Sequence, residues 1–147
     1  SEYVAGLGFE TVAFDVSPAA IRTTRGRYPD SGVEYAVANV FDLPDEWGSA
    51  FDLVVEVLTV QSLPTDVRGA ATDAITRLVA PDGILLVIAA ARTEDEPSDG
   101  PPWPLTRADV DRFATARLVT VGVEDLAVPD NPPAHRWRAE FRAGSRA

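Results

Sequence analysis

Short apolar runs alternate with helix-like segments along the chain, and this alternation limits the possible folds more than any other feature of the sequence. The runs at residues 11–16, 51–58 and 84–91 are apolar on both faces, which is typical of strands buried inside a parallel sheet. Residues 33–38 predict a further strand, and residues 67–79 carry one apolar stripe at helical spacing. This alternation predicts an α/β fold with a doubly wound, Rossmann-like sheet.

Local signals mark where these elements begin and how the chain ends. Ser17 is a favourable N-cap and Pro18 a favourable first residue for a helix that should run to about Gly26. Apolar and polar residues alternate at 117–127 and at 135–142 around a proline-rich turn, which predicts an antiparallel pair. The sheet should therefore be mostly parallel with an antiparallel C-terminal hairpin. For a chain of 147 residues we expect a single domain.

Charge and missing residue types exclude several classes of function. The 13 basic residues are all arginine and stand against 23 acids, and the net charge of −10 opposes binding to nucleic-acid phosphates. The chain has no cysteine, and its single histidine, His135, argues against a histidine-rich metal site. No hydrophobic stretch approaches the roughly 20 residues that span a bilayer. We therefore expect a cytoplasmic protein with no metal and no nucleic-acid or membrane partner.

Polar residues at the ends of the predicted strands are the first candidates for a ligand site, because open α/β sheets bind ligands there. Asp15 ends its strand, where a carboxylate can accept hydrogen bonds from both hydroxyls of a ribose. The alternative is an acid at a helix N-terminus, although Ser17 already supplies the cap. Asn39 could accept from an adenine amino group, with Val40 and Phe41 against the ring, or it could close an ordinary turn.

Three further residues offer a similar choice between ligand and structure. Glu56 ends an apolar strand, where an unpaired acid is expensive. It could contact a cofactor, act as a base with a raised pKa, or pair with a backbone donor or an arginine such as Arg92. Gln61 could contact a ligand or cap a helix. Trp103, in the proline-rich and acidic loop 93–104, could cover a substrate pocket or anchor its own loop.

Taken in order, five stretches of the chain resemble class I S-adenosylmethionine-dependent methyltransferases, and most nearly a small bacterial branch similar to thiopurine S-methyltransferases. The stretches cover nearly the whole chain: YVAGLGFETVAFDVSPAAI (3–21), VANVFDLP (37–44), FDLVVEVLTVQSLP (51–64), LVAPDGILLVIAAAR (78–92) and PPWPLT (101–106). The fold of that family is a seven-stranded sheet with a reversed last strand, which agrees with the predicted terminal hairpin.

The resemblance implies roles for the first group of strand-end residues. Asp15 matches the acid that holds the cofactor ribose, and Val16 lies beside the adenine. Asn39 stands where the family usually has an aspartate that contacts the adenine amino group. Val40 and Phe41 match the apolar neighbours of that aspartate.

The resemblance also implies roles at the next strand end. Glu56, Val57 and Leu58 match the strand end that lies under the methionine part of the cofactor. We expect Gln61 and Trp103 to contact the substrate.

The implied reaction is methyl transfer from S-adenosylmethionine to an O, N or S atom of a small molecule, for which the protein supplies alignment and excludes water. Only a hydroxyl acceptor would need a general base, and Glu56 is the candidate. The alternative is a non-catalytic or degenerate α/β module that binds a protein partner or a nucleoside. A nicotinamide-dependent oxidoreductase is disfavoured, because a chain without lysine lacks the usual Tyr/Lys pair.

The family's glycine-rich motif, of the form D/E/P-x-G-x-G-x-G, is missing from the 147 residues. It should precede residues 1–5, which resemble the end of a helix. We therefore expect the first strand of the sheet to be absent and the chain to be an N-terminally incomplete part of a longer gene product.

Overall fold

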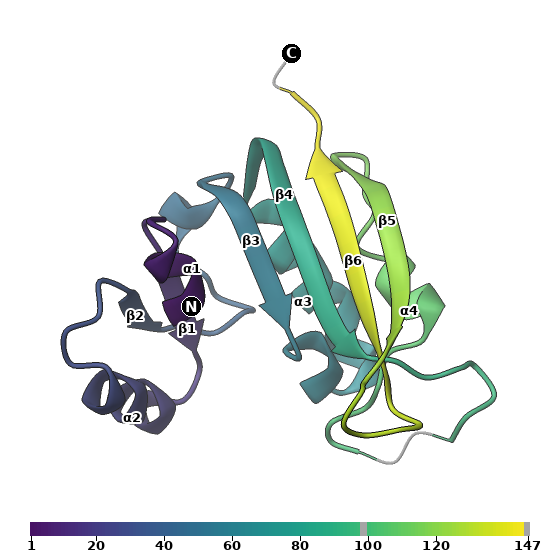
Figure 1. Cartoon of the computed structure of the whole chain (residues 1–147). Helices are drawn as coiled ribbons and strands as arrows, with labels where there is room; N and C mark the ends of the chain where they lie inside the picture. The colour runs from purple at the N-terminus through teal and green to yellow at the C-terminus, as the bar shows by residue number, and fades with distance from the viewer. Residues whose placement is uncertain (98–99, 146–147) are drawn as a thin grey trace. The chain divides into compact units, whose positions relative to one another are not determined.

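The computed structural model describes residues 1–97 and 100–145 (Figure 1). The chain divides into two compact units, Ser1–Pro44 and Asp45–Ala147, each with its own sheet, and they are described separately. The expected single domain stays a prediction. None of the helices within the described ranges is long and apolar enough to cross a membrane.

The first unit is built on one pair of parallel strands. Its elements in chain order are α1 (Glu2–Gly6), β1 (Val12–Asp15), α2 (Pro18–Arg27) and β2 (Glu34–Val37). The predicted start of α2 is confirmed, because the Ser17 hydroxyl accepts a hydrogen bond from Ala20 N at 3.2 Å and Pro18 is the first helical residue. A small core of Ile21, Val33 and Tyr35 packs the strands against α2.

The second unit is a four-stranded sheet. Its strands lie in the order β3 (Phe51–Val57), β4 (Val79–Ala90), β6 (His135–Ala143) and β5 (Leu118–Ala127). β3 and β4 are parallel, and β6 runs antiparallel to both β4 and β5, so the reversed strand lies between them. Two helices, α3 (Thr65–Arg77) and α4 (Arg107–Asp111), lie behind this sheet in Figure 1. Two short 3-10 helices, η1 (Asp45–Trp47) and η2 (Val60–Ser62), flank β3.

Residues of β4 alternate between two faces of this sheet. Leu85, Val87 and Ala89 are completely buried on the helix-covered face, where Phe141 of β6 packs against Phe113 with ring centroids 6.0 Å apart. The opposite face carries Ile84, Leu86 and Ile88 of β4, and we call it the arginine face, because its residues on β6 are Arg136, Arg138, Glu140 and Arg142. One face of the sheet is thus buried under the helices, and the arginine face is charged and partly apolar.

The structure corrects two expectations. In the described part of the chain, two strand pairs are parallel and two are antiparallel, so the strand pairing is mixed rather than mostly parallel. The strand expected at 84–91 begins earlier, at Val79, and the turn expected around Gly83 is an irregularity inside β4. The chain makes this bend with Asp82 in the left-handed region, at φ 62°.

The bend in β4 predicts a strong effect of Gly83→Ala. A Cβ atom there would lie 2.8 Å from the Ala80 carbonyl oxygen and 3.1 Å from the Asp52 carbonyl oxygen, and backbone atoms cannot move away cheaply. We expect the free energy of unfolding to fall by about 1–3 kcal/mol in urea titrations. Gly69→Ala in α3 is the control, because nothing lies within 4 Å of its added Cβ. The control should gain about 0.5–1 kcal/mol, and equal effects of the two changes would contradict the prediction.

Candidate functional site

The carboxyl end of β1 presents an acid whose hydrogen-bonding capacity is only partly used. Asp15 is the last residue of β1 and is exposed. Its Oδ1 accepts a hydrogen bond from Ser17 N at 2.7 Å, so the residue helps to start α2. Its Oδ2 has no partner among the described residues, which leaves acceptor capacity for a ligand. Asp15 can therefore serve both roles considered from the sequence: Oδ1 supports the start of α2, and Oδ2 is available to a ribose hydroxyl.

The turn after β2 is closed by Asn39. Its Oδ1 accepts from Phe41 N at 3.0 Å, and its carbonyl oxygen accepts from Asp42 N at 2.9 Å. The amide oxygen expected to meet an adenine amino group thus already holds the turn, and one of its two lone pairs is used. Val40 is 8% exposed, whereas Phe41 is 47% exposed, so Phe41 offers the larger apolar surface.

Exposed apolar side chains surround the acid at this end of the first unit. Val16 follows Asp15 and is 65% exposed, and Val37, which pairs with Asp15 across the two strands, is also largely exposed. Val37 is not recognisable as a site residue from the sequence, because a valine at the end of a predicted strand is unremarkable until its partner strand is known. A carboxylate with such neighbours suits a ligand that combines hydroxyl groups with a flat apolar ring.

Glu56, at the end of β3, lies inside the second unit. It is 4% exposed and pairs with Val87 on the helix-covered face of the sheet. Its Oε1 accepts from Thr59 N at 2.7 Å and from Val60 N at 3.0 Å, so the pairing with backbone donors is the alternative that the structure shows. Arg92 instead donates to the carbonyl oxygens of residues in its own loop.

The second carboxylate oxygen of Glu56 is buried without a hydrogen-bond partner in the described part of the chain. Burial raises the pKa of Glu56, and the two backbone N–H groups oppose this with a smaller effect. A buried and half-satisfied carboxylate favours its protonated form. Such an acid has a functional explanation or a structural one, and the turn that it holds supplies a structural one.

Leu58 continues β3 into that turn in a strained conformation. Its φ of 63° is in the left-handed region, which is costly for a leucine. Two hydrogen bonds hold it there: Leu58 N donates to the Ile88 carbonyl oxygen at 3.2 Å, and the Ser62 hydroxyl donates to the Leu58 carbonyl oxygen at 2.8 Å. Val57 and Leu58 are both exposed, so the end of β3 presents two apolar side chains on a fixed backbone.

Gln61 connects three segments from the interior. It is buried, and its Oε1 accepts from Ala90 N at 2.7 Å at the end of β4. Its carbonyl oxygen accepts from Trp103 N, also at 2.7 Å. The side chain expected to contact substrate is thus engaged with the backbone, and it places the loop that carries Trp103.

Trp103 is half-buried and packs against a buried arginine that the sequence analysis missed. The guanidinium carbon of Arg68 lies 5.8 Å from the centre of the Trp103 ring, and Arg68 Nε donates to the Leu63 carbonyl oxygen at 3.0 Å. Asp109 faces Arg68 at 3.7 Å, while burial lowers the pKa of Arg68. Residues 98–99 of the loop lie outside the described residues. An arginine on a helix usually predicts a position in solvent. Only the small and apolar residues on the same face of α3 could have indicated that Arg68 is buried.

The family described as "Methyltransferase domain" matches residues 1–87. A curated relative, the 2-heptyl-1-hydroxyquinolin-4(1H)-one methyltransferase of Mycobacteroides abscessus, is 24% identical over 132 residues. The match covers 82% of this chain and 58% of the relative, so the chain spans just over half the length of that protein.

Solved structures show the same architecture. An S-adenosylmethionine-dependent methyltransferase from Methanosarcina mazei is similar with a TM-score of 0.78 and 14% identity, over 98% of this chain and 86% of that one. The 1,6-didemethyltoxoflavin-N1-methyltransferase of Burkholderia thailandensis, solved with 1,6-didemethyltoxoflavin and S-adenosylhomocysteine, is similar with a TM-score of 0.75 and 16% identity. That likeness covers 97% of this chain and 65% of that one. At these identities the likeness concerns the fold.

The buried carboxyl group predicts a pH dependence of stability. The folded state raises the pKa of Glu56 above its ordinary value of 4.5, so it binds the proton more tightly than the unfolded state does. The free energy of unfolding should therefore fall, relative to Glu56→Gln, as the pH rises from 4.5 through the raised pKa. Urea titrations of both proteins between about pH 4 and 8 measure the difference. A difference that stays constant with pH would contradict the prediction.

Proposed function

The chain belongs to the family of methyltransferase domains, and from this membership we propose that it transfers a methyl group from S-adenosylmethionine to a small-molecule acceptor. The fold is accordingly the Rossmann-like methyltransferase fold. The observation that carries the proposal is the exposed carboxylate of Asp15 with its unused oxygen and its apolar neighbours. It lies at the carboxyl end of a parallel strand, within the residues that the family matches.

The first unit offers the groups that a nucleoside requires. Asp15 can accept hydrogen bonds from ribose hydroxyls through Oδ2 and the remaining capacity of Oδ1. Val16 and Phe41 would cover the adenine, with Val40 beside them. Asn39 would use its second lone pair and its amide N–H groups at the edge of the ring.

From the resemblance, we propose that the end of β3 contacts the methionine part of the cofactor. Val57 and Leu58 are exposed at the end of β3 and would line its apolar portion. Glu56 fixes the turn behind them and acts as a positioning residue. Glu56 is also the base expected for a hydroxyl acceptor, but its carboxylate is 4% exposed on the helix-covered face and holds the turn, so we propose the positioning role alone.

When bound, the cofactor supplies an activated methyl group on a sulfonium. The residues of this chain would bind and orient it, and the apolar side chains at the strand ends would exclude water from the reacting atoms. A thiolate or a free amine as acceptor would need no base.

We propose a nitrogen heterocycle as the acceptor. By their names, the curated relative acts on 2-heptyl-1-hydroxyquinolin-4(1H)-one and the structural neighbour on 1,6-didemethyltoxoflavin, and the resemblance to the thiopurine-methylating branch supports the same class. Trp103 would offer an aromatic face to such a ring. Gln61 would place that face through its hydrogen bond to Trp103 N.

Asp15→Asn tests the cofactor site. The asparagine oxygen can still accept from Ser17 N, so the start of α2 should be kept. The charge and one acceptor for the ribose are lost, and S-adenosylhomocysteine should bind about ten- to a hundredfold more weakly in calorimetry. Asp30→Asn changes the charge equally at the other end of the unit and is the control. Equal affinities of the two variants for S-adenosylhomocysteine would show that Asp15 does not contact the cofactor. A protein that carries the glycine-rich motif and still binds no S-adenosylhomocysteine would favour the non-catalytic module.

Trp103→Ala and Trp103→Phe test the acceptor contact. With a panel of heteroaromatic thiols, the alanine variant should raise the KM for the acceptor several-fold and leave the KM for the cofactor unchanged. The phenylalanine variant keeps an aromatic face and should retain most of the affinity. Loss of the ring beside Arg68 should also lower the free energy of unfolding by about 1–3 kcal/mol. An unchanged KM for the acceptor in the alanine variant would show that Trp103 only anchors its own loop.

A further inference from the structure

An apolar cavity of about 260 Å³ lies in the second unit, at the end of the sheet where β4 finishes and the hairpin of β5 and β6 turns. Its lining includes Ile88 from β4, Leu126, Val128 and Pro129 from β5 and the hairpin turn, and Arg136 and Arg138 from β6. The body of the cavity is therefore hydrocarbon, with two guanidinium groups among its lining residues. We call it the hairpin cavity.

The strand register explains why these side chains meet. Arg138 pairs with Ile88 on one side and with Glu124 on the other, and Arg136 pairs with Leu126. Directly paired residues project to the same face of a sheet, so all of these side chains belong to the arginine face. Most of the lining thus comes from the strands, and Val128 and Pro129 of the hairpin turn complete it.

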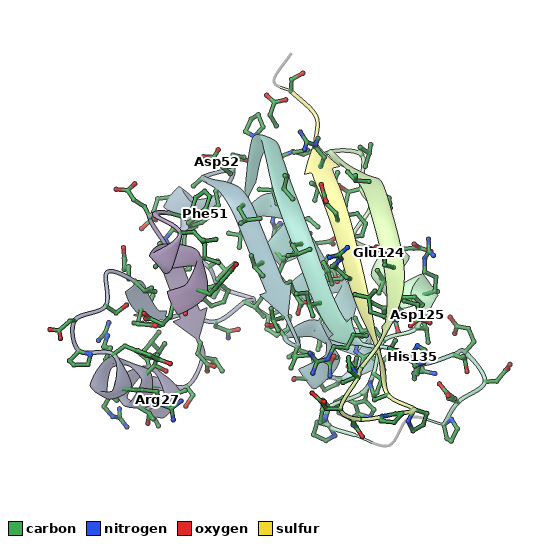
Figure 2. All side chains as sticks on the ribbon, in the orientation of Figure 1. Arg27, Phe51, Asp52, Glu124, Asp125 and His135 are labelled. Carbon is green, nitrogen blue, oxygen red and sulfur yellow. The ribbon has the colours of Figure 1, made fainter. Side chains whose placement is uncertain are left out.

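Only one of the two arginines has an acidic partner. Arg138 Nε donates to Glu124 Oε2 at 2.6 Å, and its Nη2 donates to the same oxygen. His135 Nδ1 lies 2.6 Å from Asp125 Oδ1, and Figure 2 labels Glu124, Asp125 and His135 at this end of the hairpin. The Arg136 guanidinium makes no hydrogen bond or ion pair with any residue in the described part of the chain, although the Arg136 backbone belongs to the ladder between β4, β6 and β5. In a chain with 23 acids and 13 arginines, this guanidinium gives the hairpin cavity a positive charge that no acid among its lining residues balances.

The hairpin cavity adjoins the strand end assigned above to the cofactor. Ile88 pairs with Val57, and its carbonyl oxygen accepts the hydrogen bond from Leu58 N at 3.2 Å. A ligand that rests on Ile88 therefore lies one strand away from the exposed end of β3. All of these contacts are within the second unit.

We propose that the hairpin cavity binds the methyl acceptor and selects acceptors that carry an acidic group, a carboxylate or an ionised hydroxyl, on an aromatic body. The inference rests on the proposed function and adds the charge of the substrate. The apolar lining would take the edge of the ring system that carries the acidic group, because Trp103, which is proposed to contact the acceptor ring, does not line the cavity. The Arg136 guanidinium would take the anionic group, because its planar N–H donors match the two oxygens of a carboxylate at once. Glu124 balances Arg138 and would repel a cationic ligand.

The test compares two probes that differ only in charge, quinoline-2-carboxylate and quinoline-2-carboxamide, by calorimetry on the full chain without cofactor. We expect the carboxylate to bind about tenfold more tightly. Arg136→Met keeps the apolar stem and removes the charge, so it should abolish this preference and leave the affinity for the carboxamide unchanged. Arg142→Met is the matched control, since Arg142 lies on the same strand and face and pairs with Ile84, outside the cavity. It should keep the preference.

Three results would overturn the inference: equal binding of the two probes, no binding of either at millimolar concentration, or equal loss in the two arginine variants. The last result would indicate general attraction to positive charge. The S-adenosylhomocysteine titration separates this inference from the proposed function. A chain that binds S-adenosylhomocysteine and does not prefer the carboxylate overturns the acceptor class alone. A protein that prefers the carboxylate, carries the glycine-rich motif and binds no S-adenosylhomocysteine overturns the methyltransferase proposal and supports the anion site.

Discussion

The buried carboxylate of Glu56 fixes the arrangement of residues at the end of β3. By accepting two backbone hydrogen bonds it forms the turn into η2, and η2 contains Gln61, which ties β4 to the loop of Trp103. The same turn follows the strained residue Leu58. The two hydrogen bonds offset only part of the cost of burying the acid, because Oε2 has no partner in the described part of the chain and the pKa of Glu56 is raised. A side chain that first suggests chemistry is thus also the support on which neighbouring positions depend.

The sequence predicted the elements well, because their signals are local. The cap at Ser17 is formed as predicted, and the structure adds a capping box of Thr106 with Asp109 at the start of α4. Strand pairing is a non-local property and was less accessible. The bend at Gly83 consists of a register shift between two strands, and a turn signal in one strand cannot distinguish it from a loop.

The candidate site shows the same limit at the level of side chains. Connectivity placed Asp15 and Asn39 at strand ends, and the structure finds them there. The order of the elements could not predict that the Asn39 side-chain oxygen accepts a hydrogen bond within its own turn. Nor could it predict that the Gln61 side chain accepts one from the backbone of β4. These partners belong to other parts of the backbone, whose distance is set by packing. Arg68 was missed for the related reason that helical periodicity treats an arginine as solvated, whereas here Trp103 and Asp109 compensate its burial.

The hairpin of β5 and β6 has one buried face, which packs into the core, and one charged face, where substitutions can be tolerated. Along β6, Ala139 and Phe141 face the helices and are completely buried, while Arg136 and Arg138 face the opposite side. Because successive residues of a strand alternate between faces, a change of charge on the arginine face leaves the core packing intact. The same alternation holds Ile88 in place under the hairpin cavity. On such a surface, one substitution can change the preferred ligand and leave the free energy of unfolding unchanged. We therefore place the selection of the acceptor on this hairpin. The support of the cofactor lies on the buried turn after β3.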